Sequence, residues 1–140
     1  ASWKADGITL IDYQTLNYGT QGLFIDLNDN IYLADPNKTS IMMFSKRNNM
    51  TRRDIGQGLL APTAIFVTKD GDVYLNHRLG GANVEKWSLN GSIGSPVMST
   101  NSSCRALFVD LNDTLYCSLT EEHRIIAMSL SNSSWKSIMI

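Results

Sequence analysis

The segment Phe24-Ile-Asp-Leu-Asn-Asp-Asn-Ile-Tyr32 decides the fold, because it recurs twice without a gap. The other copies are Phe66-Val-Thr-Lys-Asp-Gly-Asp-Val-Tyr74 and Phe108-Val-Asp-Leu-Asn-Asp-Thr-Leu-Tyr116, and both intervals are 42 residues. A fixed period of this length indicates that one structural unit was copied. Each copy then buries its apolar surface against its neighbours.

Each copy contains four runs that favour β-strands, rich in β-branched and aromatic residues and separated by polar turns. The first runs are 23–27, 64–68 and 106–111, the second 31–34, 73–76 and 115–118, the third 41–44, 84–87 and 125–128, and the weaker fourth 50–55, 95–100 and 134–140. The pattern predicts a four-stranded antiparallel meander in each copy. Asn28-Asp29, Asp70-Gly71 and Asn112-Asp113 predict two-residue hairpins between the first two strands, with positive φ at both positions.

The first two strands carry apolar side chains on successive residues, such as Phe24-Ile25 and Phe66-Val67, and therefore on opposite faces. A sheet with two apolar faces must be covered on both sides. We therefore predict an all-β fold, a partial β-propeller with blades at 22–56, 63–100 and 105–140 and a leading outer strand, 5–12, from a preceding blade. Because a propeller closes with at least four blades, we expect further blades in flanking sequence rather than association of copies.

Composition excludes several classes of partner. The chain has 140 residues, 43% of them hydrophobic and 18% charged, with a formal net charge of −1. This balance fits a packed domain and gives no field that would attract DNA or anionic lipid. No apolar run approaches the roughly 20 residues that span a bilayer. The chain begins at Ala1 without a leader, and we expect a fragment or a processed product.

Acceptor triplets for N-glycosylation are more frequent than chance. Residue frequencies predict about two Asn-x-Ser/Thr triplets, whereas six occur. The excess favours a secreted or extracellular glycoprotein, and the alternative is a cytoplasmic chain with turns rich in Ser and Asn. The six candidate sites are Asn37, Asn49, Asn90, Asn101, Asn112 and Asn132.

Residues 22–35, Gly-Leu-Phe-Ile-Asp-Leu-Asn-Asp-Asn-Ile-Tyr-Leu-Ala-Asp, resemble the NHL repeat of six-bladed propellers. The resemblance covers residues 5–140. The first copy follows the family string at Asp26, Tyr32, Asp35, Asn37 and Ile41, and the third copy follows it at Asp110, Tyr116, His123, Arg124 and Ile125. Leu119 stands where the third copy should have its second aspartate, and the second copy has Thr68 and His77 in place of both. WD, kelch and Tyr-Trp-Thr-Asp signatures are absent.

Three aspartates of this pattern are predicted to be structural. Asp26 and Asp110 can tie the first hairpin of their copies, and Asp35 can accept backbone N–H bonds in the loop that follows strand two. Asp26-x-Asn28-x-Asn30 imitates the start of a calcium loop, but Ile31 occupies the glycine position and Asn37 the position of the bidentate glutamate. We therefore expect no calcium there, and no cofactor elsewhere.

The loops between strands two and three should share one face of the propeller, the face usually used for recognition. The candidate recognition residues in these loops are Lys38, His77, Arg78, His123 and Arg124. Two histidines on separate blades could hold a metal, although surface loop histidines without a role are commoner. Lys46-Arg47 and Arg52-Arg53 form a short basic patch without interleaved aromatics, which favours a solvated turn over RNA binding.

Cys104 and Cys117 are the only cysteines and form a candidate disulfide. A two-residue turn at Asn112-Asp113 places Cys117 opposite Phe108, about 13 Å from Cys104 along the strand. That separation is too large for a bridge unless the chain before the strand folds back, whereas an extracellular location would favour one. The sequence leaves both states open.

Function divides into two main hypotheses. One is a non-catalytic binding module of the NHL type, which binds another protein or a glycan. The other is an enzyme, because gluconolactonase-like and amidating-lyase propellers share this fold and hold a metal in the central channel; RNA binding is a further alternative. An enzyme of that kind needs inward Glu, Asp or His from several blades, and the available aspartates already have structural roles. No nucleophile elbow or phosphate loop occurs. We expect a binding module and no catalytic residues.

Overall fold

The computed structural model describes residues 6–11, 19–77, 82–90 and 93–139. They form three four-stranded antiparallel sheets, each a meander in chain order. The strands are β1 (Gly22–Ile25), β2 (Asn30–Ala34), β3 (Ile41–Ser45), β4 (Thr51–Ile55), β5 (Ala64–Val67), β6 (Asp72–His77), β7 (Ala82–Ser88), β8 (Ser95–Thr100), β9 (Cys104–Val109), β10 (Thr114–Leu119), β11 (Arg124–Ser129) and β12 (Trp135–Met139), with 3-10 turns η1 (Lys46–Asn48) and η2 (Thr120–Glu122).

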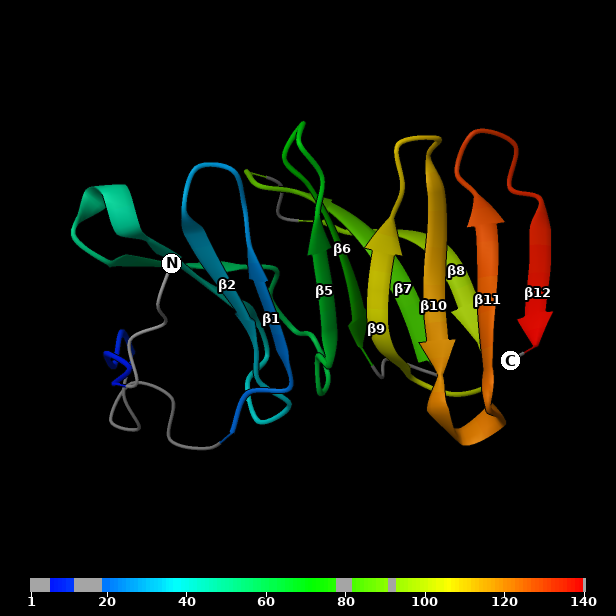
Figure 1. The fold of residues 1–140 in the computed structure, drawn as a ribbon, viewed down its shortest axis with the longest axis horizontal. Coiled ribbons are helices and arrows are strands. Elements are labelled where there is room, and N and C mark those ends of the chain that lie inside the picture. The colour runs from blue at the N-terminus through cyan, green and yellow to red at the C-terminus, as the bar shows by residue number, and fades with distance from the viewer. Residues whose placement is uncertain (1–5, 12–18, 78–81, 91–92, 140) are drawn as a thin grey trace.

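The three sheets are called blades 1, 2 and 3, for β1–β4, β5–β8 and β9–β12. Figure 1 shows them side by side in chain order, and the first strands β1, β5 and β9 contact their counterparts in the neighbouring blades. The predicted all-β fold with three antiparallel blades is confirmed. In the described part of the chain no helix has the length and apolar character needed to cross a bilayer.

The predicted leading strand, 5–12, is not formed in the residues that can be described. Residues 6–11 have no strand structure, and residues 5 and 12 lie outside the described residues. The reason is physical: an outer strand needs a hydrogen-bonding partner, and the third strand of a preceding blade is not among these 140 residues. Ile11 instead packs against the outer face of blade 1, on a cluster formed by Ile31, Leu33, Met42 and Phe44.

The hairpins between the first two strands of each blade differ from the predicted two-residue turns. In blade 1 the N–H of Asp26 donates to the carbonyl of Asn30 (3.1 Å), and the N–H of Asp29 donates back to Asp26 (3.1 Å). Only one loop residue per hairpin has positive φ: Asp29 (61°), Gly71 (87°) and Asp113 (56°). This is a three-residue loop, a tight turn followed by one left-handed residue.

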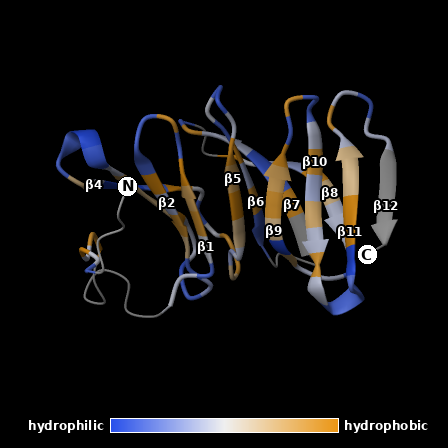
Figure 2. Ribbon diagram, viewed as in Figure 1, coloured by the Kyte–Doolittle hydropathy of each residue, from blue (hydrophilic) through white to orange (hydrophobic). Residues whose placement is uncertain are grey.

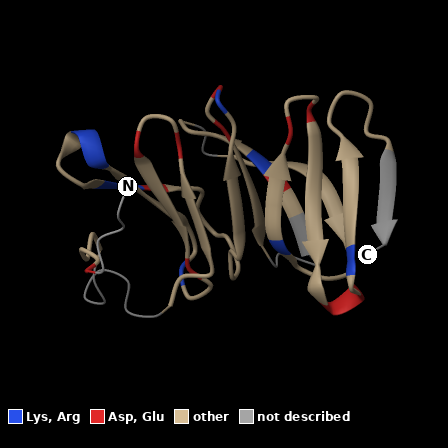
Figure 3. Cartoon of the chain, viewed as in Figure 1, with Lys and Arg blue, Asp and Glu red and all other residues tan. Residues whose placement is uncertain are grey.

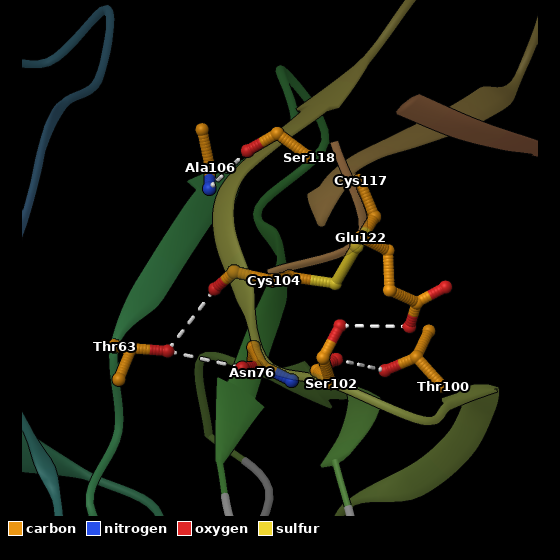
Figure 4. Close-up of a disulfide and its surroundings, with 9 residues drawn as sticks. All are labelled: Thr63, Asn76, Thr100, Ser102, Cys104, Ala106, Cys117, Ser118 and Glu122. Atoms are coloured by element: carbon orange, nitrogen blue, oxygen red, sulfur yellow. Dashed lines mark hydrogen bonds between the residues drawn. A yellow bond between two sulfur atoms is a disulfide. The ribbon is translucent and has the colours of Figure 1, made fainter. Parts of the chain in front are cut away.

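The longer loop shifts the register by one residue and resolves the question of the disulfide. Cys117 pairs with Leu107 rather than with Phe108, and an extra residue in β9 then pairs Leu119 with Cys104. The two cysteine Cα atoms lie 5.3 Å apart, and Cys104 and Cys117 are disulfide-bonded in the interior (Figure 4). The estimate of about 13 Å was wrong because it assumed the shorter turn and a regular ladder.

Two apolar clusters fill the spaces between the blades. One joins blades 1 and 2 and includes Tyr32 (0% exposed) and Leu75 (0%); the other joins blades 2 and 3 and includes Tyr74 (4%) and Leu115 (0%). Hydrophobic residues accordingly concentrate along the strands, and hydrophilic ones at several of the connecting turns (Figure 2). Each blade is therefore stabilised mainly by contact with the next, as a repeat architecture requires.

The rings of the three repeated phenylalanines contact one another from one blade to the next. The ring of Phe66 lies edge-on to Phe24, with centroids 4.9 Å apart, and edge-on to Phe108 at 5.2 Å. This geometry is favourable for aromatic pairs. Phe66 thus contacts both neighbouring blades, whereas Phe108 is 55% exposed on the far side of blade 3.

We predict that Phe66→Ala lowers the free energy of unfolding by about 3 kcal/mol, because it removes packing at two interfaces. Phe108→Ala, the matched change at the exposed end, should cost less than about 1 kcal/mol. Urea unfolding followed by intrinsic fluorescence measures both values. Equal losses would show that the phenylalanine contacts do not hold the blades together.

Candidate functional site

The first hairpin of blade 1 is organised by the carboxylate of Asp26. Its Oδ1 accepts the N–H groups of Asn28 (2.8 Å) and Asn30 (2.9 Å). Its Oδ2 accepts the side-chain amide of Asn30 (2.8 Å) and the hydroxyl of Tyr32 (2.9 Å). Burial alone would raise the pKa of Asp26, but these hydrogen bonds, led by those from Asn30, outweigh it and lower the pKa. Burial and the bond to Asp26 together raise the pKa of Tyr32.

Blade 3 repeats this arrangement at Asp110. The carboxylate accepts the N–H groups of Asn112 and Thr114, both at 2.9 Å, and the hydroxyl of Tyr116 at 3.1 Å. The backbone bond from Thr114 is the main cause of the lowered pKa of Asp110. The structure therefore places Asp26 and Asp110 as hairpin ties, in the role predicted for them.

Blade 2 keeps the hairpin and loses the carboxylate. Thr68 replaces the aspartate, and its hydroxyl accepts the N–H of Asp72 at 3.1 Å. Tyr74 therefore lacks the acid that binds Tyr32 and Tyr116. The ammonium of Lys86 lies 5.9 Å from the centre of the Tyr74 ring and 2.7 Å from Asp72. Burial raises the pKa of Tyr74, and the Lys86 charge opposes this rise.

A cleft with a volume of about 670 Å³ opens between blades 2 and 3, beside Tyr74 and Lys86. Pockets of roughly 300–1,000 Å³ are typical of ligand sites. Apolar walls come from Phe66, Val97, Met128 and Leu130, and the polar lining includes Lys69, Asp70, Asp72, Asp110, Asp113 and Ser131. The cleft lies at the hairpin end of the sheets, where Figure 3 shows acidic positions in all three blades. Its lining comes from both blades.

His77 was predicted to lie in a recognition loop, and this prediction is wrong. His77 is the last residue of β6 and only 1% exposed. Its Nε2 is 3.2 Å from Oε2 of Glu85, which also accepts the indole N–H of Trp87 at 2.9 Å. The prediction failed because β6 extends one residue further than its apolar run, so that His77 lies in the strand at the position of Leu119 in β10, whereas the equivalent Asp35 follows the end of β2.

Three of the remaining predicted recognition residues, Lys38, His123 and Arg124, lie at the other end of the sheets from the cleft. Lys38 lies in the β2–β3 loop, and His123 and Arg124 lie at the β10–β11 connection, at the lower edge of Figure 1. Arg124 contacts Glu122 of its own loop, and Arg78 lies outside the described residues. Among the described residues, no group of three or more His, Cys, Asp or Glu side chains is arranged to hold a metal ion.

Two other sequence features have local partners. Asp35 is fully buried, and its Oδ1 accepts the N–H of Asn37 at 2.9 Å, which is the turn bond predicted for it. In the basic patch, Arg52 forms an ion pair with Asp54 (2.7 Å), and Arg53 donates to Oδ1 of Asn90 in blade 2 (2.9 Å). Both arginines are thus engaged within the chain rather than presented as a phosphate-binding surface.

All six candidate glycosylation asparagines are exposed: Asn37, Asn49, Asn90, Asn101, Asn112 and Asn132. A glycosyltransferase needs the acceptor nitrogen at the surface, so the positions meet the steric requirement for modification. Two of them, Asn112 and Asn132, neighbour residues that line the cleft.

Comparisons with known proteins place the chain in the β-propeller class by structure. It matches a chain of the nidogen/laminin complex with 18% identity and a TM-score of 0.68, over 79% of this chain and 44% of that one. It matches virginiamycin B lyase from Staphylococcus aureus with 10% identity and a TM-score of 0.67, over 87% and 41% of the two chains. It also matches Kuenenia stuttgartiensis hydrazine synthase with 13% identity and a TM-score of 0.70, over 87% and 36%.

These similarities establish the fold, and the chain spans less than half of each matched structure. No protein-family model matches the sequence, and no curated protein matches it either. Propellers of this fold include enzymes and components of binding complexes. The function must therefore be argued from the residues of the site.

We predict that Asp26→Asn lowers the free energy of unfolding by about 1–2 kcal/mol at neutral pH, because the hydrogen bonds to a charged acceptor are lost. The folded-state pKa of Asp26 lies below 3.8, so its contribution is complete above that value and is lost as the pH falls through the folded pKa. Denaturant unfolding between about pH 7 and pH 3 should therefore show a smaller acid-induced loss in the variant. Asp29→Asn, at an exposed neighbouring turn position, is the matched control and should behave as the unmodified protein.

Proposed function

We propose that this chain is part of a larger extracellular propeller of the NHL type, and that it binds another protein without catalysing a reaction. The observation that carries the proposal is the cleft between blades 2 and 3. It joins charged, aromatic and aliphatic side chains from two rigid sheets, which is the composition of a recognition site.

Four further observations support the proposal. The NHL-like string is kept at the hairpin acids Asp26 and Asp110, and six acceptor triplets with exposed asparagines favour an extracellular location. One matched structure is a complex of nidogen with laminin, a protein–protein assembly. Phe108 holds the repeat position of Phe24 and Phe66, whose rings each contact the following blade. The exposed ring of Phe108 could make the same contact with a further blade.

We expect a photoreactive residue at Leu111 to capture a protein partner when the full-length protein is incubated in the extracellular fluid of its source. Leu111 lines the cleft and is 97% exposed. Leu27 holds the equivalent hairpin position in blade 1, is 85% exposed and does not line the cleft, so it is the matched control. Mass spectrometry identifies the products, and unlabelled protein should compete with capture.

Equal capture from Leu111 and Leu27 would contradict recognition at this cleft. Capture from neither position, in fluid that contains a partner isolated by other means, would contradict it as well.

The extracellular location has a separate test. Glycopeptide mass spectrometry of the protein from its native source should find glycans on several of the six asparagines. Because exposure permits modification at every site, the expected result does not depend on one position. Six unmodified asparagines would contradict secretion through a glycosylating compartment.

A further inference from the structure

One arginine bridges blades 1 and 2. Arg53 on β4 reaches across to the turn between β7 and β8 of blade 2. There its guanidinium contacts the carbonyl oxygen of Leu89 and donates to Oδ1 of Asn90 at 2.9 Å. At this position between two blades, the chain itself places a guanidinium against a backbone carbonyl and an adjacent side-chain oxygen.

The gap between blades 2 and 3 lacks this arginine. In blade 1, Met43 pairs with Arg53. In blade 2, Lys86 holds the position of Met43 and pairs with Ser95. Ser95 therefore occupies the place of Arg53. A serine side chain is too short to reach the next blade. The next two residues, Pro96 and Val97, line the cleft.

The residues that bind the Arg53 guanidinium have counterparts beside the cleft between blades 2 and 3. Asp72 pairs with Ser88 in blade 2, and Thr114 pairs with Ser129 in blade 3. The two residues that follow Ser88 are therefore equivalent to the two residues that follow Ser129. Leu130 and Ser131 correspond to Leu89 and Asn90, and both line the cleft.

The charges that line the cleft favour a cation. Lys69 is paired with Asp70 at 3.0 Å, and Lys86 with Asp72 at 2.7 Å, within blade 2. The acids of blade 3, Asp110 and Asp113, have no cationic partner among the described residues. Asp110 already accepts three hydrogen bonds, whereas the exposed side chain of Asp113 makes none to the described residues.

We propose that the cleft between blades 2 and 3 binds an arginine side chain of a partner protein, in the place that Arg53 takes between blades 1 and 2. The inference rests on the proposed function and specifies the chemistry of its partner. A guanidinium presents five donors in a planar fork, which suits several oxygen acceptors better than an ammonium does. The walls at Val97, Met128 and Leu130 can cover the aliphatic stem and neighbouring side chains of the partner.

The test uses N-acetyl-arginine amide as the probe, with the protein labelled for amide NMR. We expect saturable shifts at the amides of Asp113, Leu130 and Ser131, and at least about tenfold weaker binding of N-acetyl-citrulline amide, which has the same shape without the charge. Spectra are recorded before and after enzymatic removal of N-glycans, because Asn112 and Asn132 flank the cleft. Equal binding of the two probes, or shifts elsewhere only, would overturn the proposal.

Two variants test whether binding of the arginine probe depends on the charge of Asp113. Asp113→Asn should weaken binding of the arginine probe about tenfold, since asparagine tolerates the left-handed φ of 56° and removes only the charge. Asp29→Asn changes the equivalent residue of blade 1, also left-handed with a φ of 61°, and should leave binding unchanged. Similar losses in both variants would contradict a site at the second gap.

Ser95→Arg should restore the missing arginine, abolish binding of the probe and raise the melting temperature. Ser95→Gln, a polar side chain without the charge, should retain most of the binding. If Ser95→Arg folds and still binds the probe as the original protein does, the equivalence of the two gaps is wrong. If Leu111 captures a partner that binds equally well after its arginines are replaced by citrulline, the binding function stands and the assignment of arginine fails.

Discussion

The fold of this chain depends on the burial of both faces of each sheet. The middle blade shows this most clearly, because Leu75 packs toward blade 1 and Tyr74 toward blade 3 from adjacent positions of one strand. Burying one such side chain contributes about 1.5–3 kcal/mol, whereas a typical hydrogen bond contributes about 1 kcal/mol net. Packing between blades therefore dominates, and the hairpin bonds of Asp26 and Asp110 refine a structure that the packing already requires.

The differences between the copies are more informative about function than their agreement. Blade 2 exchanges the hairpin aspartate for Thr68 and keeps the turn, because a hydroxyl can accept the same backbone N–H. The exchange leaves Tyr74 beside Lys86 instead of a carboxylate. In the same blade, Ser95 stands in the place of Arg53. Thr68 lines the cleft and Ser95 directly precedes its lining residue Pro96, so both differences lie in one copy of the repeat beside the same cleft.

The sequence predicted the order and approximate limits of the strands within the three blades, because a period of 42 residues repeats the same apolar pattern, but the leading strand at 5–12 is not formed in residues 6–11. It did not predict the turn geometry, since Asn-Asp and Asp-Gly suit both two-residue and three-residue hairpins. One extra loop residue moved Cys117 from Phe108 to Leu107, and the register shift between Cys117 and Leu119 then brought it close to Cys104. His77 was misplaced because a polar residue at the end of a strand resembles the start of a loop. The cleft was missed because it arises from side chains of two blades, although comparing Arg53 with Ser95 could have indicated it.

The contacts at the opposite end of blades 2 and 3 explain why the cleft can keep its shape. The hydroxyl of Thr63, just before β5, lies 3.1 Å from the carbonyl oxygen of Cys104 and 3.0 Å from Oδ1 of Asn76 (Figure 4). The disulfide holds Cys104 to β10 at the same end. The two sheets are thus fastened where β5 and β9 begin and are parted at their hairpins. A site whose walls are fixed in this way loses little conformational entropy when a side chain enters, and this favours binding by a short segment of a partner.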